Sequence, residues 1–193
     1  MKALYLLAAP IVLVGCATQQ TQQNVEIGFR GAVIGSAPSR EMKLLEKWHP
    51  ALGVVSREIS DAYAMPIEPS TLGDLTIKDV TYEYFKNKLF RIEVNLWTET
   101  QTRCPNANEL INALESQYKI SMTRHQADYA RHEFLSQWRG SNAWVTYMCQ
   151  PWNSTNSITI ESPTLAQEVE ASLRAIRMDK ERNSSEKIKR ALQ

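Results

Sequence analysis

The segment of residues 75–98 constrains the fold more than any other part of the chain. Apolar residues occupy alternate positions on both sides of the short polar stretch Lys86-Asn87-Lys88. A period of two is typical of a strand with one buried face, and two such runs around a short turn predict an antiparallel hairpin. The residues expected in its core are Val80, Tyr82, Tyr84, Phe90, Ile92, Val94 and Leu96. The residues expected on its solvated outer face are Lys88, Arg91, Glu93 and Asn95.

Three other segments show apolar residues at helical spacing. They predict helices over residues 39–48, with Ser39 as N-cap, over residues 105–118, and from Pro163 to about Met178, with Ser162 as N-cap. The expected buried positions are Leu44, Leu45 and Trp48 in the first, Ala107, Leu110, Ile111, Leu114 and Tyr118 in the second, and Leu165, Val169, Leu173 and Ile176 in the third.

Further strands are expected over residues 24–35, over residues 134–149 around a turn at 140–142, and over residues 157–162. A short strand at residues 53–57 is expected within a long proline-containing connection, residues 49–73. The order of elements predicts an α+β fold in which two or three helices pack on an antiparallel sheet, with two helix-plus-meander halves. We expect one domain over residues 25–178 and a charged tail over residues 179–193 that frays or projects.

The N-terminus predicts export. Lys2 is followed by an apolar run, residues 3–14, which is shorter than the roughly 20 residues that a membrane-spanning helix needs. Residues 1–15 are therefore expected to be a signal peptide. The sequence Leu13-Val14-Gly15-Cys16 resembles the lipobox of bacterial lipoproteins. This resemblance implies a lipidated Cys16 as the first mature residue, and two or more acyl chains would hold the protein on a membrane. A cysteine that follows an ordinary signal peptide by chance is the alternative.

Residues 16–24 are polar and uncharged, and they predict a flexible tether. The lipoprotein resemblance adds a sorting hint, because an aspartate after the cysteine favours the inner membrane in enterobacteria. Here Ala17 follows Cys16, which implies the periplasmic face of the outer membrane. Helix-then-meander units in a lipoprotein are similar in outline to the BamE/SmpA class of assembly lipoproteins and to beta-lactamase inhibitor proteins. The long connection departs from the compact BamE pattern.

The other two cysteines, Cys104 and Cys149, are interpreted in the light of export. In an oxidising compartment such a pair predicts a disulfide, which the chain-entropy model values at roughly 4 kcal/mol. A nucleophilic cysteine partnered by His125 or His132 is the alternative. The whole chain has 22 basic and 21 acidic residues, and loss of Lys2 with the signal leaves the mature chain neutral. Nothing in this balance indicates a nucleic-acid partner.

Two clusters are candidates for chemistry. His125, Asp128 and His132 would share one face of a helix and approach a metal, although two adjacent arginines would oppose a cation. Four acidic residues around the long connection form a candidate carboxylate pair for glycoside hydrolysis. These residues are Glu58, Asp61, Glu68 and Asp74. Because an exposed polar surface is the simpler explanation of both clusters, we expect no catalytic residues, no metal site and no cofactor.

Tryptophans suggest a binding role instead. Trp97, Trp144 and Trp152 are candidates for an exposed interaction surface, with coverage by the last helix as the alternative. Trp144 should share the outer face with Thr146 and Met148. The sequence therefore favours a lipid-anchored outer-membrane protein that binds an envelope protein as an accessory or scaffold subunit. The alternatives are an inhibitor or immunity lipoprotein and a peptidoglycan- or metal-dependent hydrolase.

Overall fold

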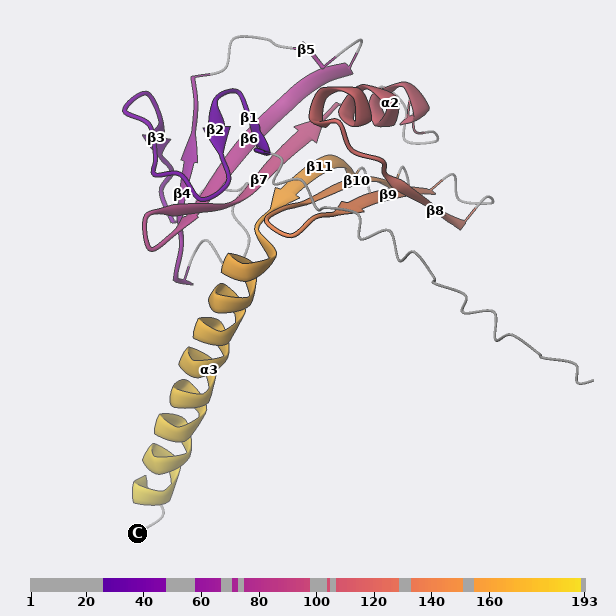
Figure 1. The fold of residues 1–193 in the computed structure, drawn as a ribbon. Coiled ribbons are helices and arrows are strands. Elements are labelled where there is room, and N and C mark those ends of the chain that lie inside the picture. Colours follow the sequence, from indigo (N-terminus) through magenta and orange to yellow (C-terminus); the bar gives the residue numbers. More distant parts are fainter. Residues whose placement is uncertain are drawn as a thin grey trace, which may run out of the picture.

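The computed structural model describes residues 26–47, 58–66, 71–72, 75–97, 104, 107–128, 133–150 and 155–191. Within these residues the chain forms one large antiparallel sheet, a small hairpin and two α-helices, which is an α+β arrangement (Figure 1). The expected signal peptide and tether, residues 1–24, lie outside the described residues.

The strands are β1 (Gly28–Phe29), β2 (Ala32–Val33), β3 (Lys43–Leu44), β4 (Asp61–Ala64), β5 (Thr71–Leu72), β6 (Leu75–Phe85), β7 (Lys88–Leu96), β8 (Thr123–Asp128), β9 (Glu133–Arg139), β10 (Trp144–Gln150) and β11 (Thr155–Glu161). The helices are α2 (Ala107–Tyr118) and α3 (Pro163–Ala191). In the described residues the large sheet has nine strands, ordered β3-β4-β6-β7-β11-β10-β9-β8, and β5 pairs with β6 beside this path.

The expected hairpin forms the centre of the sheet as β6 and β7. Its turn consists of Lys86 and Asn87, with φ angles of 51° and 63°. Two consecutive positive φ angles match the right-handed twist of the strands, and asparagine adopts them at low cost. The expected strands over residues 134–149 and 157–162 are confirmed as β9, β10 and β11.

Helix α2 covers one face of the sheet, which we call the inner face. Its five buried residues, Ala107, Leu110, Ile111, Leu114 and Tyr118, pack into one apolar core with side chains of the inner face. Inner-face side chains from the central strands include Leu89, Ile92, Val94, Val145, Tyr147, Cys149, Ile158 and Ile160, each at most 1% exposed. Val145, Tyr147 and Cys149 therefore face the core as the alternation predicts.

A β-bulge changes the direction of one predicted core residue. Glu83 lies opposite Arg91 and Tyr84 opposite Leu89, so Phe90 is an extra residue in β7. An extra residue reverses the alternation, because the two residues of a bulge oppose a single partner. The expectation that Phe90 joins Ile92 on the inner face is therefore wrong. Phe90 packs instead in a second cluster with Phe85, Val169 and Leu173.

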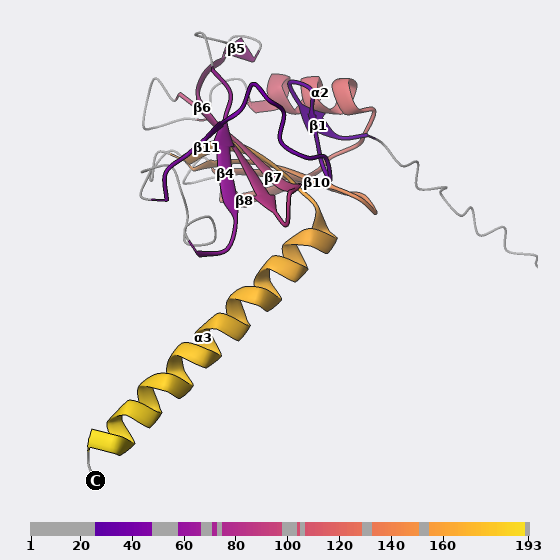
Figure 2. The same cartoon turned by 90° about the vertical axis from the view of Figure 1, so that its left-hand side faces the viewer.

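Helix α3 begins as the sequence predicts and extends further than expected. The Leu165 amide donates to Ser162 Oγ at 3.3 Å, and Pro163 is the first helical residue. The helix continues to Ala191 rather than ending near Met178, because the expected tail contains no glycine or proline and many good helix formers. Figures 1 and 2 show that this part of α3 extends away from the sheet, on the side opposite α2.

Two other predictions are wrong, and a third is not confirmed. Residues 39–47 form turns and the short strand β3 instead of a helix, and Leu44 is 59% exposed. Since this segment has few apolar positions, pairing of β3 with β4 outweighs its helical spacing. Residues 24–35 contain a tight hairpin, β1–β2, where one strand was expected. Residues 123–128 form an edge strand, β8, so the two matching halves are not confirmed.

Candidate functional site

The face of the sheet opposite α2 is the candidate site, and we call it the outer face. Strand register aligns its side chains in three rows that cross β9, β10, β11, β7 and β6. The first row is Arg139, Trp144, Glu161, Arg91 and Glu83; the second is Gln137, Thr146, Thr159, Glu93 and Thr81; the third is Leu135, Met148, Ser157, Asn95 and Asp79.

Most of these outer-face side chains are only partly buried. Thr146, Met148, Thr159, Glu93 and Asn95 are all of intermediate exposure. Among the described helices, α2 packs on the inner face, and α3 contacts the outer face only beside the first row. Thr81 and Ser157 are buried, and the other members of the second and third rows present partly exposed hydroxyl, amide and carboxylate groups around Leu135 and Met148.

An ion pair organises the first row. Arg91 Nε donates to Glu161 Oε2 at 2.7 Å, and Arg91 Nη2 donates to the same oxygen. Burial alone lowers the pKa of Arg91, but Glu161, Glu83 and Glu93 together raise it, so the guanidinium stays charged. In the same row the Arg139 guanidinium carbon lies 5.1 Å from the Trp144 ring centroid, within the range of a cation–π contact.

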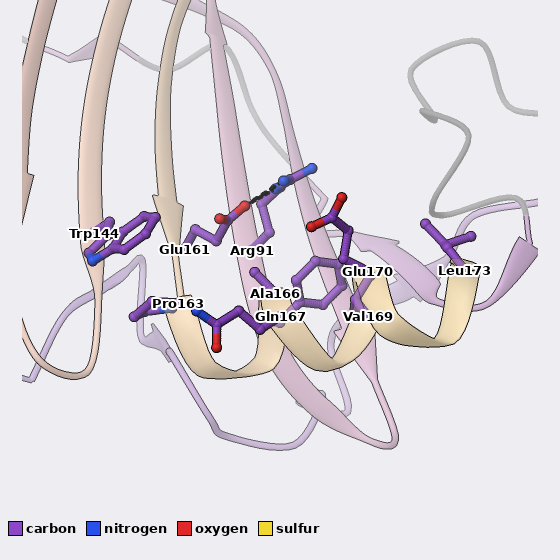
Figure 3. Close-up of a pocket in the computed structure, with 10 residues that line it drawn as sticks. Arg91, Trp144, Glu161, Pro163, Ala166, Gln167, Val169, Glu170 and Leu173 are labelled. Atoms are coloured by element: carbon purple, nitrogen blue, oxygen red, sulfur yellow. Dashed lines mark hydrogen bonds and ion pairs between the residues drawn. The ribbon is translucent and has the colours of Figure 1, made fainter. Parts of the chain in front are cut away.

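A pocket of about 290 Å³ lies where the first turns of α3 pass beside the middle of the first row. Trp144, Arg91 and Glu161 line it from the sheet, and α3 contributes apolar side chains together with Gln167 and Glu170. Figure 3 shows the Trp144 ring beside Glu161, with Ala166 and Val169 along the helix. The pocket combines an apolar wall, an aromatic ring and carboxylates, which suits insertion of a side chain from another molecule.

The structure does not bring Trp97 and Trp144 together. Trp97 is 56% exposed, as expected for a residue opposite the buried set, and Lys78 Nζ lies 5.7 Å from its ring centroid. Trp144 is half-buried beside α3, at the other end of the outer face. Arg91, which shares the row of Trp144, precedes Trp97 by six residues, about 20 Å along a strand. Trp152 lies outside the described residues.

The two candidate catalytic clusters are not assembled in the described part of the chain. His125 and Asp128 lie on strand β8 rather than on one helical face, and His132 lies outside the described residues. No group of three or more potential metal ligands occurs in the ranges that the structure describes. Glu58 pairs with Lys180 at 3.1 Å and Asp61 with Lys47 at 3.2 Å, while Glu68 and Asp74 fall in undescribed segments.

The two cysteines lie at disulfide distance. Cys104 Sγ and Cys149 Sγ are bonded, and their Cα atoms are 6.0 Å apart. Cys149 is fully buried on the inner face, and Cys104 precedes α2 by a few residues. The bond therefore links the start of α2 to strand β10. Cys16 lies outside the described residues, and no helix in the described ranges is long and apolar enough to cross a membrane.

Sequence reasoning identified Trp144 and missed its neighbours in the pocket. Alternation alone places Arg91 and Glu161 on the outer face, and this was the signal that the sequence offered. Their pairing depends on the register of β7 against β11.

No family model, no curated protein and no solved structure matches this chain.

Proposed function

We propose that this protein is a lipid-anchored component of the bacterial outer membrane, facing the periplasm, that acts by binding another envelope protein through its outer face. The proposal rests on how the described helices cover the two faces of the sheet. Helix α2 packs on the inner face, whereas α3 contacts only the first row of the outer face. Mixed polar and apolar side chains on a partly exposed surface suit a protein interface.

Fixed geometry supports binding by the outer face. Asn95 Nδ2 donates to Asp79 Oδ1 at 2.7 Å, and Arg91 pairs with Glu161. These contacts hold long side chains in place before a partner arrives, so less rotamer entropy is lost on binding. The hydroxyls of Thr146 and Thr159, which are register partners, add hydrogen-bonding groups between them.

Membrane attachment rests on the lipobox-like sequence at Cys16. Lipidation of this cysteine would keep the folded domain close to the membrane through the segment of residues 16–24. A Cys16→Ser variant should move from the membrane fraction to the soluble periplasmic fraction. Membrane association that persists in this variant would remove the tether from the proposal.

Site-specific crosslinking in intact cells tests the binding surface. A photoreactive amino acid at Met148 or Thr159 should capture the same partner, because both positions lie on the outer face. The matched control is Leu44, which is exposed but belongs to β3 at the far edge of the sheet. Equal capture from Leu44, or none from the outer face, would contradict the proposal.

The same experiment separates a scaffold role from inhibition. A scaffold subunit should be captured with a membrane-embedded or membrane-anchored assembly. An inhibitor or immunity lipoprotein should instead be captured with one soluble enzyme at fixed stoichiometry, and the purified chain should then lower the activity of that enzyme.

A further inference from the structure

The C-terminal part of α3 carries an exposed isoleucine among charged and polar residues. Lys180 pairs with Glu58, and beyond it the side chains of residues 181–190 are all exposed. Most of these residues are charged or polar, yet Ile188 lies among them with 58% of its surface exposed. A helical segment this short and this polar gains little stability by itself, since most helix stability in proteins comes from packing.

Ile188 lies on the same face of α3 as the pocket. Glu170 lines the pocket, and Ile188 follows it by about five helical turns, or about 27 Å, which returns the side chain to the same direction. Between them, at spacings of three or four residues, this face carries Arg174, Arg177, Glu181 and Ser184. One face therefore has the pocket at its beginning and an exposed isoleucine at its end.

Charge is distributed unevenly along the same helix. Near the pocket, Glu161 of the sheet pairs with Arg91, which also lines the pocket, and Glu168 pairs with Lys86. Glu170 is exposed, and its pairing with Arg174 spans 3.9 Å. Lys187 and Lys189 flank Ile188 at the other end. Two copies of α3 placed side by side in opposite directions would bring these lysines of each copy close to Glu170 of the other.

We propose that two copies of this chain form a two-fold symmetric dimer through antiparallel pairing of α3, in which Ile188 of each copy enters the pocket of the other. Aligning Ile188 with the second copy's Glu170 fixes the register. That register places Arg177 opposite the second copy's Glu181, and symmetry repeats the pair. Arg177 and Glu181 form no ion pair with any described residue of their own chain, so both charges are open to this contact.

A second copy fits this surface better than an anionic membrane. A membrane-surface helix has an apolar face opposite a basic one. Here Glu181 and Glu186 lie among the basic residues, and Ile188 and Met178 point in different directions. The pocket also provides an apolar site next to the exposed Glu170, which matches an isoleucine flanked by lysines. The inference does not depend on the proposed function, since it uses α3 rather than the second and third rows.

Sedimentation velocity on the mature chain carrying Cys16→Ser tests the dimer. The mass should change from one chain to two as the concentration rises, and high salt should weaken the association because exposed charges are screened. Ile188→Asn and Arg177→Glu should each raise the dimer Kd by at least about tenfold. Ile188→Leu should preserve the dimer.

A charge exchange makes the register testable. The double variant Arg177→Glu with Glu181→Arg reverses both members of the proposed pair and should restore the dimer that Arg177→Glu weakens. The matched control is Arg182→Glu, which makes the same charge change about 140° around the helix and should leave the dimer intact. Circular dichroism should show equal helix content in all variants.

Three outcomes would overturn the inference. One is a single-chain mass at every concentration. Another is a dimer that is indifferent to Ile188→Asn and Arg177→Glu. The third is failure of the double exchange to restore association. A monomer that binds vesicles of anionic lipid, with loss of binding in Lys187→Glu, would replace the second copy with a membrane surface.

Discussion

The two faces of the large sheet are built from the same strands and differ in almost every other respect. On the inner face Ile92, Val94 and Ile160 are completely buried under α2. On the outer face their sequence neighbours Glu93, Asn95 and Thr159 are polar and half-buried. Alternation along a strand separates the two sets, so each face can change without disturbing the other. Packing determines the inner face, whereas the outer face carries polar, partly exposed side chains.

Loss of the disulfide should have the largest effect, because Cys149 belongs to the inner face. Replacing Cys104 and Cys149 together with alanine should lower the free energy of unfolding by about 4 kcal/mol, since the bond closes a loop with a sequence separation of 45. Urea denaturation of the oxidised and reduced wild-type protein measures the same difference. An unchanged midpoint on reduction would show that the inner layer does not depend on this link.

Neighbouring residues of β11 allow the two faces to be compared directly. Ile160→Ala should cost about 2–5 kcal/mol of unfolding free energy, because it leaves a cavity beneath α2. Thr159→Ala, one residue earlier and on the outer face, should cost less than about 1 kcal/mol. Chemical denaturation of both variants gives the two values. Similar costs would mean that the outer face is also part of the core.

The sequence predicts the inner face better than the outer one. Alternation identified β6, β7, β10 and β11, because apolar residues recur at alternate positions over most of each strand. The capping residues Ser162 and Pro163 marked the start of α3, because a helix begins with a local hydrogen bond that the sequence shows directly. Both signals are local, and they hold where the strand pairing agrees with them. They fail at residues 39–47, where pairing of β3 with β4 outweighs the helical spacing, and at Phe90, where the bulge reverses the alternation.

The failures involve structure that depends on distant partners. Strand β8 has no alternation of its own and forms an edge of the sheet by pairing with β9. The bulge at Phe90 depends on how β7 meets β6, and it decides that Phe90 contacts α3. The pocket depends on both the bulge and the register of β11, so no single segment of sequence could have predicted it.

A substitution in the first turns of α3 should lower the free energy of unfolding by a smaller amount. Leu173 is 5% exposed and packs with Phe85 and Phe90 in a small cluster. Leu173→Ala should cost about 2 kcal/mol, at the low end for such changes, because a small cluster at the edge can relax around the cavity. Hydrogen exchange should show loss of protection in α3 but not in the central hairpin. Arg174→Ala, next to it and exposed, is the control, and equal loss in both variants would contradict the role of the cluster.

The smallest effects should come from tyrosine hydroxyls on the inner face. Tyr118 donates to the Gly28 carbonyl at 2.7 Å, so Tyr118→Phe should cost about 1 kcal/mol. The hydroxyl of Tyr82 is buried and has no hydrogen-bond partner among the described residues. Tyr82→Phe should therefore be neutral or slightly stabilising, since it removes an unsatisfied polar group.

Alkaline pH should lower the free energy of unfolding through the buried tyrosines and not through the outer face. Burial raises the pKa of Tyr82 to about 12, with Arg30 opposing the shift, whereas an unfolded tyrosine titrates near 10. Above that lower value the unfolded chain loses protons that the folded chain retains, so stability falls as the pH rises from about 10 to 12. The pKa values of Tyr84 and Tyr118 are raised for the same reason.

Tyr82→Phe should make the decline of stability with pH shallower, as denaturation at several alkaline pH values would show. Thr159→Ala should leave the slope of that decline unchanged. An equal slope in Tyr82→Phe and wild type would mean that this hydroxyl ionises as readily in the folded core as in the unfolded chain.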